Sequence, residues 1–329
     1  MLSRTAEHLF WMTRHTGRAE NLARVLEAQH QLSLIQPLHA NDDTALERHA
    51  RERAARGWLA ILASAGVVDR YHLAHKGVTS AEVIAFMVAD PSHPASIVSC
   101  LRAARENART VRGWAAEELW ETINTTWLDL QRLIADGLQA HDPSAFFEWV
   151  RARSNLARGV QLAAPVQDEG LDFLRLGAAI EGADHILRTL EAHGDVLAAV
   201  AFDYHRAYAL LRAVSGVEAY RRIYRDTLSS AQIASLLIQC PDWHGSLAAR
   251  LDEVRRLSVR LRNSQSAQTE RLAQLLCDEV RQAPVDEWLS SGRLSGWFAA
   301  MIVRVNDLAR RVGRDLTRPL VPGPVAAAA

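Results

Sequence analysis

Four arginines recur along one edge of a predicted helix, where their guanidinium groups could bind an anion together. Arg102, Arg105, Arg109 and Arg112 are spaced by three or four residues, which places them on one side of an α-helix. Cations so arranged repel one another unless an anionic group faces them, and guanidinium binds carboxylate and phosphate well. This arginine stripe predicts one of three arrangements: an anion pocket, an interhelical network with glutamates, or a solvated helix edge.

Carboxylates that could face such arginines lie on a second predicted helix. Glu20 and Glu27 flank an apolar seam there, and Arg24 lies between them at spacings that by themselves stabilise a helix. The same charges recur later in the chain, at Asp184, Arg188 and Glu191.

A metal site is an alternative use of the carboxylates and histidines. Glu27 with His30 has the Glu-x-x-His spacing of di-iron helical proteins, and a second candidate set has suitable spacing: Asp69, His72 and His75. The later copy offers no matching pair, because Gly194 follows Glu191 at the third position. No G-x-S-x-G motif, glycine-rich phosphate loop or Cys–His signature is present, so we expect no catalytic nucleophile, cofactor or bound metal.

The overall composition excludes several classes of partner. The 38 basic residues balance 38 acidic ones, so no net field attracts nucleic acid or an anionic membrane. Three cysteines without C-x-x-C spacing indicate neither a disulfide framework nor a thiolate zinc site. No run approaches 18 apolar residues and no signal peptide is recognisable, so we expect a cytoplasmic protein.

Helical periodicity accounts for nearly the whole chain, and no strand pattern competes with it. An apolar seam predicts a helix from Thr5 to His30, and a second seam, Ile97 to Val111, carries the arginine stripe on its flank. Further helices are predicted around Trp58 to Ala65, from Trp114 to Ala140 and from Ser144 to Arg158. The fold class is therefore all-α, a helical bundle.

An internal duplication is indicated by two sequence shifts. A shift of 150 residues places Pro91 on Pro241 and Ser96 on Ser246, and the seam of the Ile97 helix on that of a later helix. A shift of 164 aligns RAENLARVLEA, from Arg18, with GADHILRTLEA. We therefore predict two degenerate tandem repeats of a multi-helix unit, at 1–160 and 171–315, followed by a disordered tail at 316–329.

Several blocks give the chain a specific family resemblance. The opening MLSRTAEHLFWMTRHTGRAENLARVLEA, the block DPSHPASIVSCLRAARENARTVR with its continuation EELWETIN, and VSGVEAYRRIYRD resemble the bacterial alpha-E family. The resemblance implies an all-helical protein without an established activity. Genes of that family tend to accompany circularly permuted ATP-grasp proteins and peptidases, which implies a part in ATP-dependent formation or modification of peptides.

The resemblance directs attention to a set of charged and amide side chains, with some departures. The chain has Thr13 where the family usually has glycine, Gly17 where it has glutamate, and Gly182 where the second copy has a basic residue. The candidates for binding a ligand or partner are Glu20, Asn21, Arg24, Arg105, Glu106, Asn107, Arg109, Arg112 and Glu118. We expect the stripe and the Glu20 helix to meet inside the bundle or between its halves.

These observations favour a non-catalytic, accessory component of an ATP-grasp-linked system that ligates or modifies peptides or amides. Its expected partners are a circularly permuted ATP-grasp protein and a peptide or anionic small molecule. The alternatives are a stand-alone enzyme that holds an anion with these arginines and uses a glutamate as base, and a carboxylate-bridged metal protein.

Overall fold

The computed structural model describes residues 3–35, 44–113, 117–163, 168–198 and 202–317, with the side chains of 3 and 44–51 left aside. Within these residues the protein is all-helical and contains no strand. The earlier helices are α1 (Ser3–Ile35), α2 (Thr44–Ser64), α3 (Val68–His72), α4 (Ser80–Ala89), α5 (Ile97–Val111), α6 (Glu117–Ala135), α7 (Leu138–His141) and α8 (Pro143–Leu162). The later helices are α9 (Glu169–Ala198), α10 (Tyr204–Ala213), α11 (Val217–Tyr224), α12 (Ser230–Ile238), α13 (Leu247–Arg260), α14 (Ala267–Gln282), α15 (Val285–Ser290) and α16 (Leu294–Asp315).

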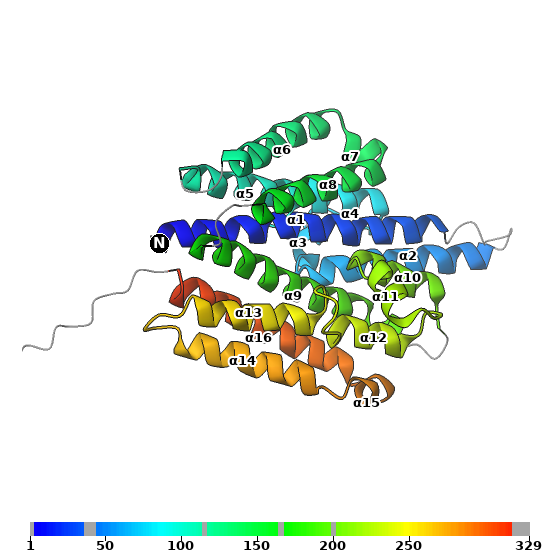
Figure 1. The fold of residues 1–329 in the computed structure, drawn as a ribbon. Coiled ribbons are helices and arrows are strands. Elements are labelled where there is room, and N and C mark those ends of the chain that lie inside the picture. The colour runs from blue at the N-terminus through cyan, green and yellow to red at the C-terminus, as the bar shows by residue number, and fades with distance from the viewer. Residues whose placement is uncertain (1–2, 36–43, 114–116, 164–167, 199–201, 318–329) are drawn as a thin grey trace, which may run out of the picture.

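The two longest helices, α1 and α9, run side by side through the middle of the molecule (Figure 1). On one side α1 packs against α5 and α8, and on the other α9 packs against α13 and α16. The outer helix α6 covers α5 and α8, while α14 covers α13 and α16 in the same way. Because each central helix has neighbours on several sides, apolar side chains are spread around its circumference rather than confined to one stripe.

The predicted seam of α1 is buried along its length. Leu9, Met12, Ala19, Ala23 and Leu26 are fully buried, and the helix extends past both ends of the predicted range. The seam contains no proline, so backbone hydrogen bonding continues unbroken across it.

The α1 and α9 backbones approach closely at Gly177. A Cβ atom built there would lie 2.4 Å from the Thr13 hydroxyl oxygen and 2.5 Å from the carbonyl oxygen of Phe10. Any larger residue would push the two helices apart, so glycine is required at this crossing.

Helices α5 and α13 begin in the same manner. Each follows a turn-rich segment, and the hydroxyl oxygen of Ser96 or Ser246 accepts a hydrogen bond from the backbone N–H three residues later. The predicted α5 seam from Ile97 to Val111 is buried, as are the residues at the corresponding positions of α13.

Other sequence expectations need correction or fall outside the described residues. The helix predicted from Trp114 to Ala140 is two helices, because Gly137 adopts a positive φ of 72° between α6 and α7. Most of the tail predicted to be disordered, 318–329, lies outside the described residues. Within the described residues no helix is both long and apolar enough to cross a membrane, and the three cysteines are unpaired and buried.

Candidate functional site

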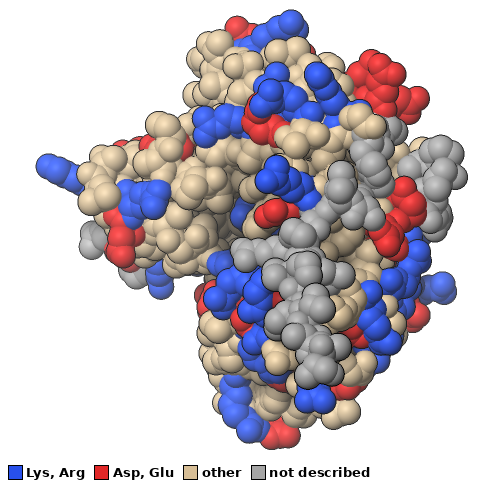
Figure 2. All heavy atoms as spheres, turned by 90° about the vertical axis from the view of Figure 1, so that its left-hand side faces the viewer, with Lys and Arg blue, Asp and Glu red and all other residues tan. Residues whose placement is uncertain are grey.

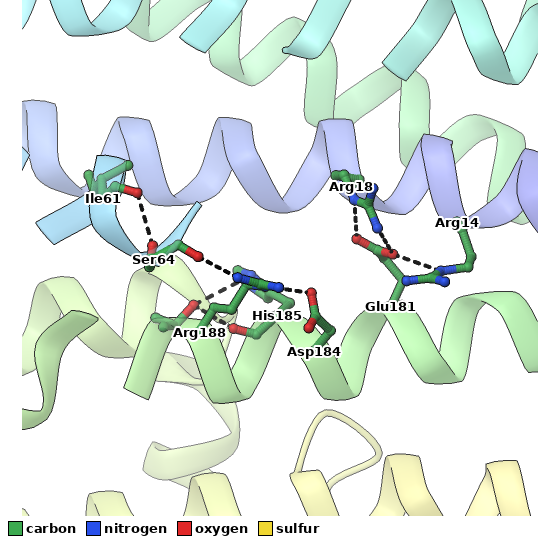
Figure 3. Close-up of polar contacts among 9 residues, drawn as sticks. Arg14, Arg18, Ile61, Ser64, Glu181, Asp184, His185 and Arg188 are labelled. Carbon is green, nitrogen blue, oxygen red and sulfur yellow. Dashed lines mark hydrogen bonds and ion pairs between the residues drawn. The ribbon is translucent and has the colours of Figure 1, made fainter. Parts of the chain in front are cut away.

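A buried glutamate of α9 joins the two central helices by binding two arginines of α1. Glu181 accepts hydrogen bonds from Arg14 Nε at 3.0 Å and from Arg18 Nε and Nη2, each at 2.8 Å (Figure 3). The side chains of Glu181 and Arg14 are only 4% and 6% exposed. Glu181 and Arg14 are thus almost fully removed from water, whereas the Arg18 side chain is 30% exposed. The buried carboxylate compensates the charges of both arginines.

Electrostatic interactions within this triad keep Glu181 and Arg18 ionised. Burial alone would raise the pKa of Glu181, but the guanidiniums of Arg18 and Arg14 outweigh it and lower that pKa to about 2. Burial would likewise lower the pKa of Arg18, yet the Glu181 carboxylate raises it above its ordinary value. The triad therefore binds α1 to α9 and is poorly suited to exchanging protons near neutral pH.

A second charged cluster links α1 to α8. Glu20, which is 3% exposed, accepts hydrogen bonds from Arg24 Nε and Nη2, at 3.2 and 2.7 Å, and from Arg158 Nη2. Burial would raise the pKa of Glu20, but Arg158 and Arg24 outweigh it and lower that pKa. Two turns further along α1, Glu27 faces Arg151 of α8 at 3.3 Å and Arg212 of α10 at 3.4 Å.

Helix α9 carries a cluster like that of Glu20 and Arg24. Asp184 Oδ2 accepts a hydrogen bond from Arg188 Nε at 2.8 Å, and Arg188 also donates to the carbonyl oxygen of Ser64 at the end of α2 (Figure 3). His185 contacts the carbonyl oxygen of Ala213, at the end of α10, through Nε2 at 3.1 Å. The polar groups of α9 thus hold the ends of two neighbouring helices.

A cavity of about 940 Å³ opens between these charged clusters. Its walls come from α1, α8, α9 and α13 together with the segment that precedes α13. Polar lining residues from each side include Glu20, Arg24, Arg158, Glu181, Arg250 and Glu253. The cavity therefore joins elements of both halves of the chain, has the size of a ligand site, and presents cations beside carboxylates.

The predicted site residues divide between this cavity and a separate surface. Glu20, Asn21 and Arg24 line the cavity. On α5, Arg105 donates from Nε to Asn124 of α6 at 2.8 Å and pairs with Glu106 at 2.9 Å. Helix α5 does pack against α1, but Arg105 and Arg109 pair with Glu106 and α6 and not with Glu20. The expectation that the stripe itself meets the Glu20 helix is therefore wrong.

The remaining predicted residues lie around the same α5 and α6 surface. Arg109 pairs with Glu106 at 2.8 Å, and the amide oxygen of Asn107 lies 2.8 Å from His8 Nδ1 on α1. Arg112 and Glu118 are exposed. The glutamate that pairs with Arg105 and Arg109, Glu106, lies on the same helix as they do. Since Arg102, Arg109 and Arg112 are exposed, the stripe is closest to the third of the expected arrangements, a solvated helix edge.

The candidate set did not include Glu181, Arg158 or Arg250. Glu181 could have been predicted from the sequence, because it lies in the apolar run AAIEGA of a long helix. A glutamate in such a run is expected to be buried and to need a cationic partner. Arg158 and Arg250 are ordinary helix arginines in the sequence, and only the packing of α8 and α13 around α1 and α9 brings them together.

Two of the residues considered as metal ligands, Glu27 and His75, have other contacts. Glu27 pairs with arginines, and the His75 ring stacks on Tyr71 with ring centroids 4.4 Å apart. In the part of the chain that the structure describes, no group of three or more His, Cys, Asp or Glu side chains could hold a metal ion.

The face of the molecule at the α1 N-terminal end shows basic and acidic side chains interspersed (Figure 2). Such a surface presents no single-signed patch of the kind that attracts a polyanion over a long range.

Comparison with protein families places almost the whole chain in one family model. Residues 1–315 match the family model Alpha-E, described as a predicted alpha-helical domain with a conserved ER motif. No curated protein and no solved structure matches the chain.

Proposed function

Because the chain belongs to the Alpha-E family, we propose that it is a non-catalytic, accessory component of an ATP-grasp-linked system that ligates or modifies peptides or amides in the cytoplasm. The observation that carries this proposal is the cavity between the two halves, where arginines from α1, α8 and α13 face one space. ATP-dependent amide ligation handles carboxylates, and guanidinium is the side chain best suited to bind them. The cavity would hold the carboxylate-bearing peptide or small molecule that an ATP-grasp partner acts on.

The alternative of a stand-alone enzyme requires a general base in the cavity. A general base near neutral pH needs a pKa close to 7. Arginines lower the pKa of both buried glutamates of the cavity, Glu20 and Glu181, away from that range. This electrostatic arrangement favours a binding role over an acid–base role.

We further propose that the two halves arose by duplication. Each half would originally have contained the family's Glu-Arg dipeptide, and each now keeps one of its two residues. The 164-residue shift aligns Gly17–Arg18 with Glu181–Gly182, so each copy retains one member of the dipeptide. The retained members, Arg18 and Glu181, bind each other across α1 and α9. In an ancestral pair with both dipeptides intact, a second, symmetry-related pair would have joined residues 17 and 182, and its two members are both glycine here.

Co-purification tests the proposed role most simply. The tagged chain is co-expressed with a circularly permuted ATP-grasp protein, and complex formation and ATP-dependent ligation are measured for each protein alone and for both together. We expect a stable complex whose ligation rate exceeds that of the ATP-grasp protein alone. Absence of a complex, or ligation by the isolated chain, would overturn the accessory role.

A further inference from the structure

Arg250 lies in the cavity wall without an anionic partner. Its Nε atom is buried and has no hydrogen-bond acceptor, and no carboxylate forms an ion pair with its guanidinium among the described residues. The other buried arginines around the site differ, since Arg14 and Arg18 are bound by Glu181 and Arg24 by Glu20. A largely buried cation without a direct ion pair is costly, so its position calls for an explanation.

Gly182 makes room for this guanidinium. A Cβ atom at Gly182 would lie 2.7 Å from Arg250 Nε and 3.0 Å from its Cζ, so the side chain of Arg250 lies directly over the α9 backbone. A glycine inside a long helix costs about 1 kcal/mol relative to alanine. The missing side chain at 182 permits Arg250 to lie in the cavity in this orientation.

The surroundings of Arg250 favour an anion. Burial lowers the pKa of Arg250 and the nearby cation of Arg158 lowers it further, and together they outweigh the opposite effect of Glu20 and Glu253. The nearest carboxylates are already engaged, Glu20 by Arg24 and Arg158 and Glu253 by Arg256. Arg250 also lies in the first turn of α13, a helix of 14 residues whose N-terminal dipole adds positive potential.

We propose that Arg250 and Arg158 form a subsite for a single anionic group, a carboxylate or a phosphate, inside the cavity. The ligand anion would lie between two guanidiniums that repel each other in its absence and would accept hydrogen bonds from both. This inference rests on the proposed function, because it specifies which group of the ligand the cavity binds. That group would be the ligand's terminal carboxylate or a phosphorylated form of it.

Isothermal titration calorimetry on the isolated full chain tests the subsite. The probes are inorganic phosphate and acetyl-dialanine with a free C-terminal carboxylate, and sodium chloride at matched ionic strength and the C-terminally amidated peptide are the negative probes. We expect saturable binding of phosphate, of the free-acid peptide, or of both, and no binding of the negative probes. Which of the two anions binds more tightly identifies the source of the anionic group.

Three variants make the test specific. Arg250→Gln removes the charge and should weaken binding at least tenfold, as expected for the loss of a hydrogen bond to a charged group. Gly182→Ala keeps the charge but displaces the guanidinium, and should weaken binding as well. Arg222→Gln, which alters an exposed ion pair on α11, should bind like the wild type.

Melting temperatures confirm that each variant is folded. Absence of saturable binding by the wild type, or equal binding by wild type and Arg250→Gln, would overturn the subsite. Failure of the ATP-grasp co-purification would leave these binding results unchanged, so the two proposals can fail separately.

Discussion

Replacing Glu181 with glutamine should destabilise the protein by about 3–5 kcal/mol, the cost of breaking a buried ion pair from one side. The substitution keeps the size of the side chain, but it removes the carboxylate that accepts three hydrogen bonds of 2.8–3.0 Å from two guanidiniums. Glutamine resembles the protonated carboxyl group, and a pKa of about 2 in place of 4.5 corresponds to about 3 kcal/mol favouring the charged form. The cost of a broken buried ion pair and the pKa shift of Glu181 therefore agree in magnitude.

Urea unfolding followed by circular dichroism at 222 nm and pH 7.5 measures this loss. Glu218→Gln, which breaks an exposed pair with Arg222, is the matched control and should change the free energy of unfolding by less than about 0.5 kcal/mol. A triple variant, Arg14→Leu with Arg18→Met and Glu181→Leu, replaces the whole triad by apolar groups and should recover most of the stability lost by Glu181→Gln. A loss below about 1 kcal/mol for Glu181→Gln would refute the claim that this carboxylate compensates two buried cations.

Two further predictions concern the helix crossing and the buried histidines. Gly177→Ala should lower the free energy of unfolding by about 1–3 kcal/mol, because its Cβ would meet Phe10 and Thr13. Gly194→Ala, in the same helix with its nearest neighbour at 4.0 Å, should instead be neutral or stabilising, and equal effects of the two changes in urea unfolding would argue against the close approach. Burial lowers the pKa of His15, His93 and His185 from 6.5 to about 4, so the unfolded chain binds more protons and stability should fall as the pH drops from 6.5 towards 4. His93→Phe should keep the stacking on Phe86 and, relative to its effect at pH 7.5, raise stability at pH 5 by about 2 kcal/mol; a pH-independent effect would be inconsistent with a buried neutral imidazole.

The helical elements could be predicted from the sequence because burial repeats with the helical period. The seam from Leu9 to Leu26 and that from Ile97 to Val111 are both buried as expected. The prediction missed the break at Gly137, because a glycine near the end of a helical pattern can either continue the helix or end it in a left-handed conformation.

The site was only partly predictable, since ion pairs between helices depend on packing that no local pattern encodes. Glu20 and Arg24 are one turn apart, so their contact follows from helix geometry alone. Arg158 lies on another helix and is 138 residues from Glu20 in the sequence, so no local spacing predicts their hydrogen bond. The arginine stripe was chosen as a candidate because its regular spacing is visible in the sequence of a single helix. In the structure its partners are Glu106 on the same helix and Asn124 on α6.

The most direct test of the cavity as a binding site is a nuclear magnetic resonance titration of the arginine Nε–H groups, with the Arg250 signal assigned through Arg250→Gln. If the cavity binds the anion, phosphate or acetyl-dialanine should shift the Arg250 signal saturably. The Arg18 signal should not shift, because Arg18 Nε already donates to Glu181. An Arg250 signal that does not move, or one that moves no more than that of the exposed Arg222, would contradict binding in the cavity.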